Sequence, residues 1–273
     1  MAQLIIRAGR TEGQYWHDLW HYRELFYVLA WRDVTVRYKQ TAIGVLWAFL
    51  QPFLTSVVMT LIFSKLAGLT SVPGVPYFLL VFVAQMPWQF FSASLSGSSQ
   101  SLVGNSQLIS KVYFPRLIIP AAAVVTSMVD LLISFWLLAG IMAWFHFWPT
   151  WRLVLLPVLV LIAFVSALGP GLLITALNVK YRDFRYVIPF IIQIGQWASP
   201  VAYMTSKVPG KWLLLYSLNP MVGVIDGFRW AILGGRTEVY LPGFFLSLGV
   251  TGFLMWFGIW YFRRMERSFA DVI

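Results

Sequence analysis

Long apolar stretches, separated by short segments that carry charge, dominate the pattern of hydrophobic and polar positions along the chain. A helix needs roughly 20 mainly apolar residues to cross about 30 Å of hydrocarbon. Six stretches approach or exceed this length, over residues 42–64, 77–102, 117–147, 153–179, 186–203 and 239–262. The pattern therefore predicts an all-α integral membrane protein with six transmembrane helices.

A further apolar run, over residues 212–225, is too short to cross a bilayer and contains the pair Asn219-Pro220. It predicts short re-entrant or interfacial helices, over about 212–230, on the outer side of the membrane. A tilted seventh crossing is the alternative, and it would place the C-terminus outside.

The basic residues are distributed unevenly between the two sides that six crossings define. With the N-terminus inside, the external ones are Lys65, Arg152, Lys207, Lys211, Arg229 and Arg236. The remaining 14 of the 20 Lys and Arg residues fall in cytoplasmic segments. Because cytoplasmic loops collect Lys and Arg, we expect both termini in the cytoplasm. The net charge of +10 is then a topological signal, and no nucleic-acid partner is expected.

Composition excludes several functional classes. The chain is 59% hydrophobic and 11% charged, which leaves too little charge to cover a soluble domain. It contains no cysteine, so disulfide and thiol chemistry are excluded. No phosphate-binding loop of the type G-x-x-x-x-G-K-[ST] is present, so the chain is not expected to hydrolyse ATP. His17 and His21 are spaced like a metal pair, but no further ligands accompany them, and no metal site is expected.

The segment before the first span, residues 21–40, is predicted to form a weakly amphipathic helix. Leu25, Leu29 and Val36 share one face, and charged side chains are scattered around the rest. Such a helix can lie on the membrane surface, and a simple basic anchor is an equally good interpretation. The chain thus divides into a cytoplasmic segment (1–41), a transmembrane domain (42–262) and a cytoplasmic tail (263–273).

Two predicted spans carry a polar and aromatic stripe along one helical face. The stripes consist of Trp47, Gln51 and Thr55 in the first span and of Gln193, Gln196, Trp197 and Pro200 in the fifth. Because amide and indole donors are not satisfied by lipid, the stripes should face protein or a water-filled path. They either hold helices together or line a conduit whose aromatic faces stack on sugar rings while amides bond hydroxyls.

Asp130 is the one acidic residue within a predicted span. A carboxylate at that depth is a candidate for function, for example in proton coupling. Proton-coupled carriers usually show several such groups, so this role is the less favoured interpretation. The small residues between Ser92 and Ser99 allow close helix approach and are interpreted as packing.

Short motifs in a fixed order around the spans give the chain a resemblance to a known family. They are 29–38 (LAWRDVTVRY), 44–47 (GVLW) with 51–52 (QP), 105–116 (NSQLISKVYFPR), 181–185 (YRDFR), 199–201 (SPV), 219–221 (NPM) and 266–273 (ERSFADVI). Together they resemble the membrane permease of type-2 ABC exporters, in the polysaccharide branch that exports O-antigen, capsule or teichoic-acid chains.

The resemblance implies a transport subunit that moves a lipid-linked polysaccharide out of the cytoplasm across the bacterial inner (plasma) membrane. The chain would be no enzyme and would bind no cofactor, because ATP and magnesium would bind to a separate ATPase subunit. Two copies of the chain and two ATPase subunits would form the transporter. The first and fifth spans would be the walls of the conduit.

The resemblance also assigns roles to segments that hydropathy leaves ambiguous. Residues 21–40 would be an interfacial helix, about 104–116 a coupling helix on the ATPase, and about 212–230 external gate helices. The residues expected to couple to the ATPase are Gln107, Lys111, Phe114, Arg116, Arg32 and Arg37. Arg32, Arg37 and Lys39 are also expected to attract the diphosphate of the lipid carrier.

Other functions remain open at this stage. An exporter of the same architecture that moves a drug or another lipid fits most of the same features. A polytopic membrane glycosyltransferase would need acidic residues at one membrane face, whereas the acidic residues here are scattered. A carrier built on Asp130 is the third alternative.

Overall fold

The computed structural model describes residues 12–39, 42–181, 183–266 and 269, and all regular structure within them is helical. The longer α-helices are α2 (Arg23–Lys39), α3 (Ala42–Thr60), α4 (Tyr77–Gly104), α6 (Ile118–Trp144), α7 (Leu156–Lys180), α8 (Phe184–Trp197), α10 (Pro220–Ile232) and α11 (Leu241–Glu266). Shorter elements are α1 (Glu12–His21), the π-helix η1 (Leu61–Leu66), α5 (Ser106–Lys111), η2 (Trp151–Leu155), η3 (Thr205–Lys207) and α9 (Gly210–Tyr216).

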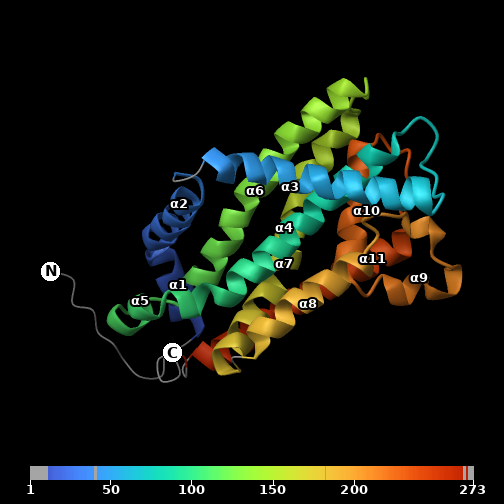
Figure 1. The fold of residues 1–273 in the computed structure, drawn as a ribbon. Helices are drawn as coiled ribbons and strands as arrows, with labels where there is room; N and C mark the ends of the chain where they lie inside the picture. The colour runs from blue at the N-terminus through green and yellow to red at the C-terminus, as the bar shows by residue number, and fades with distance from the viewer. Residues whose placement is uncertain (1–11, 40–41, 182, 267–268, 270–273) are drawn as a thin grey trace.

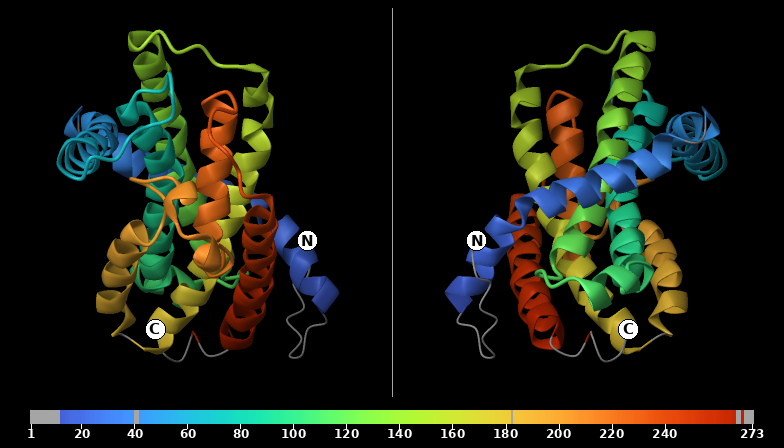
Figure 2. Two further views of the ribbon diagram at one scale, coloured as in Figure 1. Left: turned by 90° about the vertical axis from the view of Figure 1, so that its right-hand side faces the viewer. Right: turned by 90° about the vertical axis from the view of Figure 1, so that its left-hand side faces the viewer.

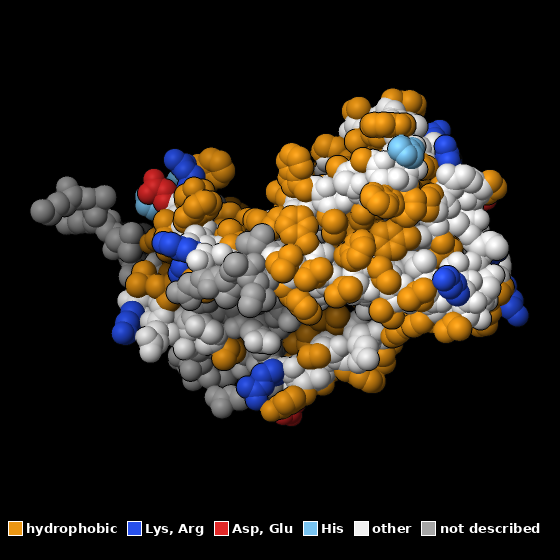
Figure 3. Space-filling model, turned by 45° about the horizontal axis from the view of Figure 1, so that its top comes forward, with side chains coloured by type: hydrophobic (Ala, Val, Ile, Leu, Met, Phe, Trp, Pro, Cys, Tyr) orange, Lys and Arg blue, Asp and Glu red, His pale blue; other side chains and the backbone are white. Residues whose placement is uncertain are grey.

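Five helical segments of the described chain are long and apolar enough to cross a membrane. They are Phe49–Leu66, Tyr77–Gly104, Ile118–Trp144, Trp151–Lys180 and Leu241–Glu266. The prediction of an all-helical membrane protein is therefore confirmed, with five of the six predicted spans. Apolar side chains cover much of the face seen in Figure 3, and basic side chains lie toward its edges.

The predicted fifth span, 186–203, is shorter in the structure. Its helix, α8, has 14 residues and ends at Trp197, and at 1.5 Å per residue it is about 21 Å long. Residues 198–201 form turns and residues 202–203 a bend, because Pro200 has no backbone N–H with which to continue the helix. The predicted continuation of the helix to Tyr203 is therefore wrong.

Helix α4 lies at the centre of the bundle (Figure 1), between α6, α7, α3 and α10. Residues 79–88 are all buried, as expected of a helix that is apolar on every side. Further along α4, small polar residues bind the neighbouring helices: Ser98 Oγ donates to Pro120 O at 3.3 Å, and Asn178 Nδ2 donates to Ser99 O at 2.7 Å. The packing role predicted for the small residues between Ser92 and Ser99 is therefore confirmed for Ser98 and Ser99.

Helices α7 and α11 approach each other closely through glycines. A Cβ atom at Gly169 would lie 2.7 Å from backbone atoms of Met255, and one at Gly258 would lie 2.2 Å from Gly169 O. Glycine is used at membrane helix interfaces because it lets two backbones come this near. The α7–α11 contact is consequently one of the most extensive in the bundle.

The two ends of the bundle carry different segments. Helices α1 and α5 and the C-terminal end of α11 gather at one end, whereas α9, α10 and the loop that joins η1 to α4 lie toward the other (Figure 1). The segments predicted to be cytoplasmic thus share an end. Helix α3 runs across α6 and α4 (Figure 1) and projects from the bundle on the same side as α8 (Figure 2).

The region predicted as external gate helices, about 212–230, forms two short helices, α9 and α10. Asn219 caps α10 by accepting a hydrogen bond from Met221 N at 3.0 Å, and Pro220 occupies the first turn. Residues 221–229 are fully buried. Arg229, counted among the external basic residues, is buried within the bundle: its side chain is 1% exposed and donates to the carbonyls of Leu80, Val201 and Tyr203.

Candidate functional site

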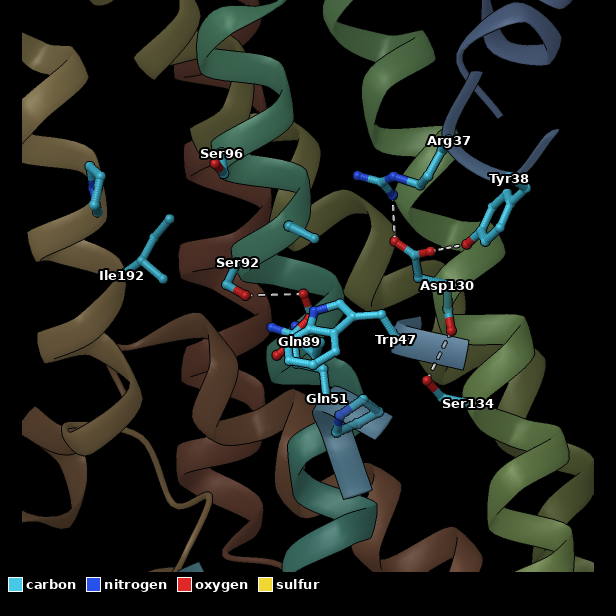
Figure 4. A pocket seen from close by; sticks show the side chains of 13 residues that line it. Arg37, Tyr38, Trp47, Gln51, Gln89, Ser92, Ser96, Asp130, Ser134 and Ile192 are labelled. Carbon is cyan, nitrogen blue, oxygen red and sulfur yellow. Dashed lines mark hydrogen bonds and ion pairs between the residues drawn. The ribbon is translucent and has the colours of Figure 1, made fainter. Parts of the chain in front are cut away.

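A cavity of about 550 Å³ opens between α3, α4, α6 and α8, with the end of α2 at its edge (Figure 4). Its lining is mainly polar and aromatic, with few aliphatic groups. The residues that line it are Arg37, Tyr38, Trp47, Gln51, Pro52, Gln89, Ser92, Ala93, Ser96, Asp130, Ser134, Pro189 and Ile192. Many more hydrogen-bonding side chains line this cavity than line a second cavity at the start of α7, which makes the first cavity the candidate site.

Helix α3 contributes Trp47 and Gln51 to the cavity, as its predicted stripe requires. The two residues are one turn apart, and the indole of Trp47 is 54% exposed. Thr55, the third residue of the stripe, does not line the cavity, since its hydroxyl donates to Gln51 O of its own helix at 2.8 Å. The stripe therefore presents a ring and an amide to the cavity, and its hydroxyl is satisfied locally.

Helix α4 supplies the opposing polar wall. Gln89, Ser92 and Ser96 face the cavity, and Ser92 Oγ donates to Gln89 O at 3.0 Å. A chain of amides extends from Gln89 to Gln85 at 3.4 Å and from Gln85 to Gln196 of α8 at 3.2 Å. Sequence reasoning missed these glutamines, although residues 85, 89, 92 and 96 recur on one helical face and carried the signal.

The carboxylate of Asp130 is paired with groups from the N-terminal segment. Arg37 Nη1 lies 2.5 Å from Asp130 Oδ2, and Tyr38 OH donates to Asp130 Oδ1. Burial, and then the hydrogen bond to Asp130, raise the pKa of Tyr38, so the phenol stays protonated and remains a donor. Ser134 Oγ donates to Asp130 O at 2.9 Å. The cluster anchors the end of α2 to α6 at the rim of the cavity.

Helix α8 contributes less to the cavity than its stripe predicts. Pro189 and Ile192 line it, whereas Gln193 is exposed outside it. Trp197 is 51% exposed, and its ring lies 6.1 Å from that of Phe63 in η1. Of the six polar and aromatic residues in the two stripes, the structure thus brings Trp47 and Gln51 into the cavity, ties Gln196 to its α4 wall, and places the other three elsewhere on the same side.

The predicted coupling segment contains a shorter helix than expected. Helix α5 has six residues, and Val112 after it is extended. Gln107 and Lys111 are exposed, but Phe114 is buried in the core. Arg116 is held within the chain: its backbone N donates to Glu266 Oε1 at 2.7 Å, and its guanidinium donates to Glu266 O. Only the α5 part of the segment therefore presents predicted side chains to a partner.

The two arginines of α2 differ in their partners. Arg32 Nη2 lies 2.7 Å from Asp33 Oδ1 and 3.0 Å from Asn105 Oδ1, so it links α2 to the start of α5. Arg37 points instead to Asp130 in the cavity (Figure 4). The structure therefore separates two residues that the sequence suggested would act together.

Within the described ranges, no three His, Cys, Asp or Glu side chains lie close enough together to hold a metal ion. The cavity also lacks a pair of free carboxylates, because Asp130 is its one acidic residue and is engaged by Arg37. The site can stack a ring, donate and accept neutral hydrogen bonds, and offer a cation at its edge.

Comparison with known proteins gives consistent matches. The profile of the family described as ABC-2 type transporter matches residues 24–233. The chain is 30% identical to the O-antigen export system permease protein RfbA of Myxococcus xanthus over 258 residues, which cover 94% of this chain and 98% of that protein. It is 25% identical to an RfbA of Klebsiella pneumoniae, with the same coverage. It is 24% identical to the capsule polysaccharide export inner-membrane protein CtrC of Neisseria meningitidis, over 81% of this chain and 83% of that protein.

Proposed function

Because the chain belongs to the ABC-2 type transporter family, we propose that it is the permease subunit of an ATP-driven exporter of a lipid-linked polysaccharide of the O-antigen, capsule or teichoic-acid type. The relatives are named as O-antigen and capsule export permeases and match the chain almost from end to end. ATP and magnesium would bind to a separate subunit. This reading is favoured over a drug exporter or a glycosyltransferase by the relatives and by the cavity.

The observation that carries the proposal is the chemistry of the cavity wall. Sugar rings have apolar C–H faces that stack on aromatic rings and hydroxyl edges that exchange neutral hydrogen bonds. Trp47 offers the ring, and Gln51, Gln89, Ser92 and Ser96 offer amides and hydroxyls. Charged groups are confined to the Arg37–Asp130 pair at the edge. A path of this kind accepts successive uncharged sugars without binding any of them tightly.

We place a second copy of the chain across the cavity. The open side of the cavity lies between α3 and α8, and both helices expose large apolar side chains there. These are Trp47, Phe53, Leu54 and Val58 on α3, and Tyr186, Phe190, Ile191 and Trp197 on α8. Two such faces turned toward each other would enclose a conduit, with α8 and the turns after it acting as the sixth crossing and both termini in the cytoplasm.

Helix α5 and the segment after it would transmit the movement that ATP hydrolysis produces in the partner. Gln107 and Lys111 of α5 are exposed, and Arg116 joins the segment after α5 to Glu266 at the end of α11. A displacement of α5 by the partner would therefore be passed directly to the spanning helix α11. Helices α9 and α10 at the opposite end would form the gate, and Arg37 and Lys39 would meet the diphosphate at the cytoplasmic mouth.

Replacing Trp47 with alanine is expected to lower polysaccharide export about tenfold, the equivalent of losing about 1.4 kcal/mol of ring stacking. Surface polysaccharide would be measured in a strain that lacks the native gene and carries the variant, with the amount of permease in the membrane determined in parallel. Trp136→Ala is the matched control, since Trp136 is 78% exposed on α6 and does not line the cavity. Equal export by the two variants, at equal membrane levels, would count against the conduit.

A further inference from the structure

A second cavity, of about 800 Å³, lies between the starts of α7 and α11 and the C-terminal half of α10. Most of its wall is apolar and includes Leu159, Ile162, Trp230, Phe244 and Leu248. Figure 2 shows α7, α10 and α11 on the side of the bundle away from α3 and α8. The cavity is therefore separate from the proposed conduit and from the face assigned to the second copy.

One end of this cavity is polar, and its donors are incompletely used. Thr237 lines the cavity and is 6% exposed, yet its hydroxyl has no hydrogen-bond partner among the described residues. Glu238, beside it, is an exposed lining residue. A buried polar group without a partner costs about 1–3 kcal/mol, so native structures rarely retain one. Thr237 indicates that a ligand oxygen belongs at this end.

A cation lies at the same end. The guanidinium of Arg152 stacks on the lining residue Trp230, with Cζ 5.0 Å from the ring centroid, and donates to Gly234 O. A Cβ atom at the lining residue Gly235 would collide with this guanidinium. The Nε atom of Arg152 is buried and has no hydrogen-bond partner in the part of the chain that the structure describes. The polar end thus combines a cation, an unused hydroxyl and an adjacent carboxylate.

The apolar part of the cavity adjoins a surface suited to acyl chains. Helices α7 and α11 are membrane-span candidates, and the lining residues Val158 and Leu241 are exposed on them. Trp148 and Trp151, which precede α7, are also exposed, as is typical of side chains at the boundary between hydrocarbon and headgroups. The polar end of the cavity therefore lies at headgroup depth and the apolar part at acyl-chain depth.

We propose that this cavity binds one phospholipid of the surrounding bilayer, with phosphatidylethanolamine as the preferred class. An acyl chain would occupy the apolar part. The phosphate would accept hydrogen bonds from the Thr237 hydroxyl and the Arg152 guanidinium, and the ammonium would meet the Glu238 carboxylate. The guanidinium and the carboxylate at the polar end are complementary in charge to the phosphate and the ammonium of this zwitterionic headgroup. The lipid would connect η2 and α7 to the loop that follows α10.

The test uses the purified full-length chain, stripped of lipid and then exposed to equal amounts of phosphatidylethanolamine and phosphatidylglycerol of the same acyl length. Retained lipid is counted by native mass spectrometry. We expect one tightly held phosphatidylethanolamine per chain. Glu238→Gln should lower the preference for phosphatidylethanolamine about tenfold, and Thr237→Val should weaken retention of both lipids. Lys211→Gln, at an exposed position outside the cavity, is the control.

A cavity-filling variant separates this site from general lipid binding. Leu248→Trp should abolish the tightly held lipid while the weakly bound annular lipid remains. Two results would overturn the proposal. One is that the unaltered chain retains neither lipid, and the other is that the Glu238→Gln variant prefers phosphatidylethanolamine as strongly as the unaltered chain does. Disulfide cross-links between two copies of a Val158→Cys, Leu241→Cys variant would overturn it as well, because they would make this face an interface between copies.

Discussion

Replacing Arg229 with methionine is expected to prevent accumulation of the folded protein. The guanidinium is buried and donates to the carbonyls of Val201 and Tyr203 at 2.8 Å and of Leu80 at 3.1 Å. The carbonyls of Val201 and Tyr203 lie in a turn and a bend, where no helical N–H replaces the lost donor. Each buried carbonyl left without a donor costs about 1–3 kcal/mol. The variant therefore loses a large part of the free energy of unfolding, which is about 5–15 kcal/mol for a typical folded protein.

The measurement for Arg229→Met is the yield of monodisperse protein in mild detergent and its thermal unfolding temperature. Arg229→Lys should be intermediate, because an ammonium keeps the charge but cannot reach three carbonyls in a planar fork. Arg236→Met is the control, since Arg236 is exposed and donates to one carbonyl, Gly74 O, at 2.6 Å. If Arg229→Met and Arg236→Met unfold at the same temperature, Arg229 does not hold α10 to α4 and the turns after α8.

Replacing Gly169 with alanine is expected to separate α7 from α11 and to destabilise the protein by about 1–3 kcal/mol, the usual cost of overpacking a core. The added methyl group would lie 2.7 Å from backbone atoms of Met255, and a backbone cannot move aside as a side-chain tip can. Unfolding temperature in detergent and the rate of proteolysis measure the effect.

Gly252→Ala is the matched control for Gly169→Ala. Gly252 lies in α11, and a Cβ atom there meets nothing within 4 Å. Since alanine is the better helix former by about 1 kcal/mol, this control should be as stable as the unaltered chain or more so. An unfolding temperature for Gly169→Ala equal to that of Gly252→Ala would show that α7 and α11 are not in close backbone contact.

The helices of the bundle could be predicted because span length and apolar content follow directly from the bilayer. Five of the six predicted spans appear with boundaries shifted by a few residues. The exception, α8, ends where Ala198 and Ser199 precede Pro200. A span predicted from uncharged residues alone extends past Pro200, whereas the helix ends before it because proline has no backbone N–H to donate.

The candidate site was predictable only in part, because its residues come from five separate helices. Helical periodicity put Trp47 and Gln51 on one face of α3, and both line the cavity. The pairing of Arg37 with Asp130, 93 positions apart, depends on how α2 packs against α6, and hydropathy carries no information about that. The burial of Arg229 was missed for a related reason: charge patterning treats every arginine as solvated, whereas one carbonyl of α4 and two carbonyls after α8 satisfy this one in the core.

The structure also divides the coupling residues by accessibility. Lys111 is exposed on α5 and available to a partner, while Arg116 is held by Glu266 and Phe114 is buried. We therefore propose that Lys111 contacts the ATP-binding partner and that Arg116 transmits movement within the chain. A substitution at Lys111 should disturb coupling without disturbing the fold, which makes it the residue of choice for testing the assembly.

The most direct test of the exporter account is the ATPase activity of this chain purified together with its ATP-binding partner, with and without lipid-linked glycan. We expect a stable complex whose ATP hydrolysis responds to the glycan. Lys111→Glu should lose that response, and Lys207→Glu, an exposed position in η3 before α9, should keep it. Failure of any ATP-binding subunit to associate, together with glycan movement by the chain alone, would contradict the account.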